Sequence, residues 1–197
     1  MNPLIHQNAG RLVWIGEHWI NALRDPDDDQ AVTWFSLFRT NHCPAGRGIT
    51  VHVIRPGPDG FSVVGTDQPE VGQWINENFF PNSTFHDPEA PLAEARFELE
   101  GDIEHQPRWM VEVADHRVVA SWNVVDPPVI AYGPFTPEKE FFTVLFFTYE
   151  SGIEIDGQRA PGKPFARDIW QNSIGGVRSS SCIALGETLI EPAKKSG

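Results

Sequence analysis

Short apolar segments, separated by Pro, Gly and Asp, recur along most of this chain of 197 residues. The segments have the length of β-strands, and the breaks at intervals of about ten residues have the composition of turns. This spacing is typical of sandwiches and barrels. The sequence therefore predicts one all-β, mainly antiparallel domain over residues 1–197, with mobile ends at 1–10 and 192–197.

Residues 48–55 show the strand pattern most clearly, because Ile49, Val51 and Val53 alternate with polar side chains before the turn PGPDG. A hairpin with residues 61–66 is expected there. Residues 69–80 start with Pro and carry apolar side chains at helical spacing, so they predict one short helix. Further strands are predicted at 11–19, 31–40, 95–101, 108–113, 117–125, 141–150 continued by 152–155, and 179–191.

The most apolar segment is FFTVLFFTYE at residues 141–150, which indicates a central strand buried on both faces. The pair Asp156 and Gly157 after it is the strongest short signal for a hairpin turn. Because several strands are apolar on both faces, we expect a closed barrel with an apolar cover or lining. A related β-sandwich stays open as an alternative, since it produces the same alternation and turn spacing.

At the level of this pattern the chain resembles the lipocalin-like barrels, whose strands enclose one small apolar ligand. The resemblance implies a site for a small apolar or aromatic molecule. The N-terminal Gly-x-Trp element of those barrels is missing here, so no residue roles carry over. Among the seven tryptophans, Trp34, Trp122 and Trp170 are our candidates for contacting such a ligand, the alternative for each being ordinary core packing.

The formal net charge of −12 argues against nucleic acid and anionic membranes as partners, because both bind proteins with a surplus of Lys and Arg. No run of uncharged apolar residues is long enough for a membrane helix, so we expect a soluble, cytoplasmic protein. Cys43 and Cys182 are too few for a disulfide framework and do not have a zinc-binding spacing. Both are expected to remain thiols.

His18 and His52 lie opposite apolar neighbours on predicted strands. If those faces line a barrel interior, the two imidazoles converge as general bases or metal ligands; otherwise they face solvent. No HxH or HExxH motif is present, so neither a metal nor an organic cofactor is predicted. Arg159 and Arg167 stand in a basic run of this acidic chain and are candidates for holding a ligand carboxylate or oxyanion, with surface ion pairs as the alternative.

Three functions follow from these candidates. The first is an enzyme that needs no metal or organic cofactor, a lyase or isomerase in preference to a hydrolase. In it His18 or His52 would transfer a proton and Arg167 would hold an oxyanion. The second is a carrier that binds an apolar ligand without changing it. The third is a structural subunit whose exposed aromatic side chains are buried in a homodimer.

Overall fold

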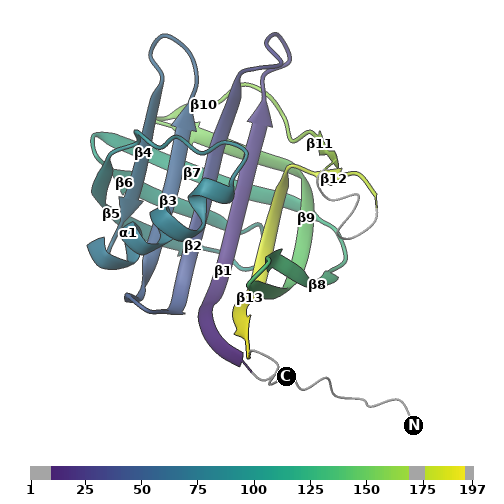
Figure 1. Ribbon diagram of the computed structural model, residues 1–197. Helices are drawn as coiled ribbons and strands as arrows, with labels where there is room; N and C mark the ends of the chain where they lie inside the picture. Colours follow the sequence, from purple (N-terminus) through teal and green to yellow (C-terminus); the bar gives the residue numbers. More distant parts are fainter. Residues whose placement is uncertain (1–9, 169–175, 194–197) are drawn as a thin grey trace.

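The computed structural model describes residues 10–168 and 176–193, and its strands close into a nine-stranded barrel (Figure 1). In chain order the elements are β1 (Gly10–Arg24), β2 (Val32–Cys43), β3 (Gly46–Arg55), β4 (Phe61–Thr66), α1 (Pro69–Asn78), the 3₁₀ turn η1 (Phe80–Asn82), β5 (Leu92–Glu100), β6 (Arg108–Val113), β7 (His116–Val125), β8 (Val129–Thr136), β9 (Lys139–Ile155), β10 (Gln158–Arg159), β11 (Ala166–Arg167), β12 (Arg178–Ser179) and β13 (Ser181–Pro192).

The barrel runs β9, β13, β1, β2, β3, β4, β5, β6, β7 and back to β9. Neighbouring strands are antiparallel except β4 and β5, which are parallel because the chain crosses over through α1 between them. The predicted all-β, mainly antiparallel class is confirmed, and closure of the sheet decides for the barrel and against the sandwich.

Strand β9 closes the barrel, because its first part pairs with β13 and its last part with β7. The predicted hairpin after it is confirmed: Asp156 and Gly157 have φ angles of 53° and 77°, and Gln158 pairs with Ile155. The predicted burial of both faces is wrong at Phe142 and Tyr149, which are 44% and 46% exposed.

The middle of the barrel is filled by side chains. Trp19 packs edge-on against Trp109 and Trp122 at centroid distances of 6.0 and 5.3 Å, and the Trp122 indole N–H donates to the Ile20 carbonyl at 2.9 Å. Asn21 is fully buried beside them and donates to carbonyls of β7 and β9. Since these side chains pack against one another, the interior is a core and not a ligand chamber.

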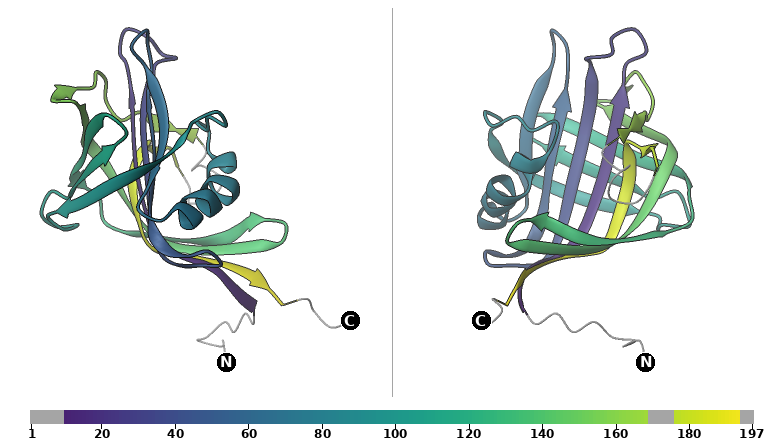
Figure 2. Two further views of the ribbon diagram at one scale, coloured as in Figure 1. Left: turned by 90° about the vertical axis from the view of Figure 1, so that its left-hand side faces the viewer. Right: turned by 45° about the vertical axis from the view of Figure 1, so that its right-hand side comes forward.

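A cover lies on the outer face of the barrel wall. Helix α1 and η1 rest against β2, β3 and β4, and the β8–β9 hairpin projects on the same side (Figure 2). Val71 and Ile75, one helical turn apart, pack with Phe79 and Phe80 against Trp14 and other outward-facing side chains. The predicted helix is confirmed, and its expected last residues form η1.

Some strand boundaries differ from those predicted. Strand β1 extends five residues beyond the expected end at Trp19, to Arg24, and strand β8 was not predicted. At the expected mobile ends, Gly10 and Pro192 pair with one another in the sheet. The rest of the predicted ends, except Ala193, lies outside the described residues.

Candidate functional site

A cavity of about 280 Å³ lies between the outer wall of the barrel and its cover. The wall is formed by outward-facing side chains of β1, β2, β9 and β13, and the cover by Phe79 after α1, by η1 and the residues after it, and by β8 and β11. Most lining side chains are apolar and many are aromatic, including Ile20, Trp34, Phe38, Phe80, Phe141 and Leu145. Such a lining favours a small apolar ligand.

His18 is on the wall of this cavity. Its Nε2 lies 2.8 Å from the Ser36 hydroxyl, and its ring stacks on Phe38 at 3.8 Å. Burial lowers the pKa of His18 to about 3, so the imidazole is neutral at physiological pH. Within the described residues no hydrogen bond orients the other ring nitrogen. In the described residues the pair therefore has no third group of the kind that orients the base of a serine nucleophile.

Glu187, which was not predicted as a site residue, also lines the cavity. A β-bulge precedes it, and Gly186 in this bulge has a φ of 59°. Desolvation raises the pKa of Glu187 to about 7. No described cation forms an ion pair with this carboxyl group. A carboxyl group of this kind exchanges protons near neutral pH.

Arg167 reaches the cavity from β11, whose two residues pair with β12. Its Nη2 donates to the Thr84 hydroxyl at 2.7 Å, and the guanidinium lies 5.4 Å from the centroid of Phe85. Burial lowers the pKa of Arg167, but the group remains a cation. No carboxylate of the described residues forms a salt bridge with it, so an anionic ligand group has an unpaired cation available.

The buried thiol of Cys182 is influenced by both charged groups. Burial raises its pKa to about 12; the Glu187 carboxylate adds to this rise and the Arg167 guanidinium opposes it. Both groups therefore act on one buried thiol of the outer face. Cys182 and Cys43 are both free thiols, as predicted.

Two further polar atoms of the cavity wall have no hydrogen-bond partner in the described residues. These are the indole Nε1 of Trp34 and the hydroxyl of Thr143, whose residues are 3% and 1% exposed. Buried polar groups are normally paired, so unpaired ones in a cavity wall are positions where a ligand is expected to bond.

The structure brings three predicted site residues, His18, Trp34 and Arg167, into one cavity. The expectation that His18 and His52 converge inside the barrel is wrong, because both side chains point outward from the wall. His52 is fully buried with Nε2 3.1 Å from the Ser62 hydroxyl, next to His86, and it does not line the cavity. Its pKa is lowered to about 4, first by burial and then by the charge of His86.

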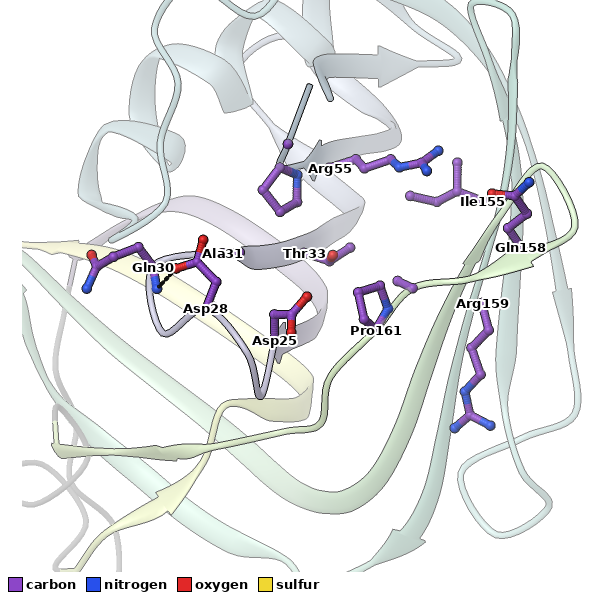
Figure 3. A pocket seen from close by; sticks show the side chains of 13 residues that line it. Asp25, Asp28, Gln30, Ala31, Thr33, Arg55, Ile155, Gln158, Arg159 and Pro161 are labelled. Carbon is purple, nitrogen blue, oxygen red and sulfur yellow. Dashed lines mark hydrogen bonds between the residues drawn. The ribbon is translucent and has the colours of Figure 1, made fainter. Parts of the chain in front are cut away.

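The remaining candidates lie elsewhere. Trp122 packs in the core, and it also lines an open cavity of about 590 Å³ with Phe146 and Pro127, away from His18 and Arg167. Arg159 lines a separate, open cavity of about 440 Å³ at one end of the barrel, together with Arg55 and Asp25, and its side chain extends in a different direction from that of Arg55 (Figure 3). Trp170 is outside the described residues.

In the described residues no group of three or more His, Cys, Asp or Glu side chains is placed to hold a metal ion. No helix in that part of the chain is both long and apolar enough to cross a membrane.

The architecture is a closed nine-stranded mixed barrel, consistent with a lipocalin-like barrel, and its candidate site lies on the outer wall. Comparison of the chain with family models, curated proteins and solved structures gave no match.

Proposed function

We propose that the outer cavity binds a small apolar or aromatic molecule carrying a carbonyl or carboxylate oxygen, and that the protein catalyses a proton transfer on it without a metal or organic cofactor. This places the protein among isomerases or lyases. The observation that carries the proposal is that neutral His18 and Arg167, which forms no salt bridge with a described carboxylate, line the same largely apolar cavity.

The dimensions of the cavity support a small ligand. Its volume of about 280 Å³ is at the lower limit of ligand pockets in proteins. The aromatic side chains of Trp34, Phe38 and Phe80 offer faces and edges for a planar apolar body. The ligand is therefore expected to be of the size of a single substituted ring.

Arg167 and His18 have different roles in this proposal. The guanidinium has N–H groups beyond the one that bonds Thr84, and these bind the oxygen of the ligand. With a pKa near 3, His18 is too weak a base to take a proton at neutral pH, so it acts by hydrogen bonding. His52 has no contact with the cavity and is not part of the proposed site.

A carrier is the second candidate, favoured by the aromatic and apolar character of most of the lining. A carrier and an enzyme could bind the same ligand equally tightly, but only the enzyme would change the ligand chemically. The homodimer stays a prediction; the exposed side chains Ile130 and Tyr132 on β8 are the surface where we expect such a contact.

Phenylpyruvate and phenylacetone test the proposed binding, because they share an aromatic ring and a ketone and differ in the carboxylate. We expect Arg167→Met to weaken phenylpyruvate binding by about 10-fold to 100-fold, since a charge-assisted hydrogen bond contributes about 1.5–3 kcal/mol. Phenylacetone binding should change little. Isothermal titration calorimetry measures both affinities.

Arg159→Met is the matched control, since it removes an equally long cation from the other cavity. It should leave phenylpyruvate binding unchanged. If neither compound binds the unmodified protein, or if Arg167→Met binds both as well as the unmodified protein does, the proposed site is wrong. Acceleration of the keto–enol interconversion of phenylpyruvate supports the enzyme, and binding without acceleration supports the carrier.

A further inference from the structure

We propose that Glu187 is the residue that moves the proton in this cavity, and that the substrate is an aryl- or alkyl-substituted 2-oxo acid interconverted between its keto and enol forms. This inference rests on the proposed function and adds to it the reacting group and the substrate class. It depends on where the β13 bulge places Glu187, on the lack of a charge partner for this carboxyl group among the described residues, and on the donors around the cavity.

The bulge places the carboxyl group on the outer face. His18 of β1 pairs with Ala184 and Gly16 pairs with Glu187, so two steps along β1 match three along β13. Because of the extra residue, odd-numbered side chains of β13 point inward before the bulge and outward after it. Ile183 accordingly packs in the barrel core, whereas Leu189 packs under the cover. In an unbroken alternation Glu187 would share the inward face of Ile183. With the bulge it lines the outer cavity instead.

The surroundings of Glu187 suit proton transfer. No described Lys, Arg or His pairs with the carboxyl group, and desolvation raises its pKa to about 7. Near neutral pH the carboxylate and the carboxylic acid are both populated, so the same group can accept a proton and return it. A structural role explains this less well, because an unpaired carboxyl group among apolar side chains destabilises the fold when ionised.

A 2-oxo acid matches the donors of the cavity. Its ketone and carboxylate oxygens can lie side by side, and a guanidinium fork binds two such oxygens at once. Arg167 uses Nη2 for Thr84 and has other N–H groups left for the ligand. The unpaired indole N–H of Trp34 is a further donor in the cavity wall. These donors stabilise negative charge that develops on the ketone oxygen.

The proposed reaction needs no second reactant. The Glu187 carboxylate takes a proton from the carbon between the ketone and the side chain of the substrate. The electron pair of that C–H bond becomes the C=C bond, and the electrons of the C=O π-bond move to the oxygen, giving an enolate. The carboxylic acid then returns its proton to the enolate oxygen, which yields the enol. The reverse sequence yields the ketone, so atoms and electrons balance in both directions.

The test is the exchange of the C3 protons of phenylpyruvate in D₂O, followed by ¹H NMR with the unmodified protein and with Glu187→Gln. We expect Glu187→Gln to lower the catalysed exchange rate by about 100-fold or more, as removal of a general base does. Binding of phenylpyruvate, measured by calorimetry, should persist. The rate catalysed by the unmodified protein should rise with pH to a plateau, with the inflection near pH 7.

Two variants keep the test independent of folding defects. Glu98→Gln removes an exposed carboxylate from β5 and should leave exchange unchanged. Glu187→Asp keeps the acid but shortens its reach, so it should retain part of the rate. Unchanged exchange in a folded Glu187→Gln would overturn this inference while leaving the proposed function standing. Binding of phenylpyruvate without any catalysed exchange would overturn the inference and favour the carrier, and absence of binding would overturn both.

Discussion

Replacing Trp122 by Ala is expected to lower the free energy of unfolding by about 3–5 kcal/mol, the usual cost of removing a large aromatic side chain from a core. The ring is fully buried, contacts Trp19 and Phe35, and donates its indole N–H to the Ile20 carbonyl. The substitution therefore leaves a cavity in the middle of the barrel and removes this hydrogen bond. Urea unfolding at neutral pH, followed by far-ultraviolet circular dichroism, measures the change.

Trp34→Ala is the comparison that separates a packed core from a ligand site. Trp34 is also buried and lines the outer cavity, but unlike that of Trp122 its indole N–H has no partner in the described residues. Fewer contacts and no hydrogen bond are lost, so we expect a smaller loss of stability than for Trp122→Ala. If Trp34→Ala were the more destabilising of the two, the packed interior described above would be the wrong account of the barrel.

The sequence predicted the local elements of the fold better than their arrangement. Alternating apolar residues and Pro, Gly and Asp turns predicted most strands, the helix and the hairpin at Asp156, because these signals act locally. Strand β8 was missed because Pro128 precedes it and Pro134 and Gly133 lie within it, and residues of these types usually interrupt a strand. It tolerates them because, in the described structure, β9 is its only pairing partner.

It was harder to predict which face of a strand points into the barrel than to predict the strand itself. On β1, Trp19 and His18 point to opposite sides, and both sides are covered by other parts of the chain. When both faces are buried, alternation does not reveal which one is the interior. His18, Trp34 and Arg167 line one cavity, but it lies on the outer face of the wall and not in the interior; their roles there stay a prediction.

Glu187 was missed for a related reason. In the segment ending LGETLIE, Ile183, Leu185 and Leu189 suggest one apolar face, and Glu187 is then an unremarkable member of the strand. The available signal was Gly186, because a lone Gly inside a strand often marks a bulge. The direction in which a bulge turns the next side chain depends on the partner strand, which the local sequence does not specify.

Stability is expected to depend on pH through three titratable side chains whose pKa values are shifted in the folded protein. His18 and His52 have pKa values of about 3 and 4 in the folded protein, below the usual 6.5, so their contribution to stability is complete above pH 6.5 and is lost as the pH falls. Glu187 acts in the opposite direction. Its pKa of about 7 exceeds the usual 4.5, so its contribution is complete below pH 4.5 and is lost as the pH rises through 7.

Between pH 6 and pH 5 each of these groups changes the free energy of unfolding by about 1.4 kcal/mol per pH unit. On acidification the two histidines lower the free energy of unfolding and Glu187 raises it, so the net fall is about 1.4 kcal/mol per pH unit. His52→Gln should make this slope close to zero. Glu187→Gln should make it about twice as steep, because the opposing group is gone. Urea unfolding at several pH values measures the slopes independently of any overall destabilisation. A Glu187→Gln slope no steeper than that of the unmodified protein would contradict the raised pKa on which its role in proton transfer depends.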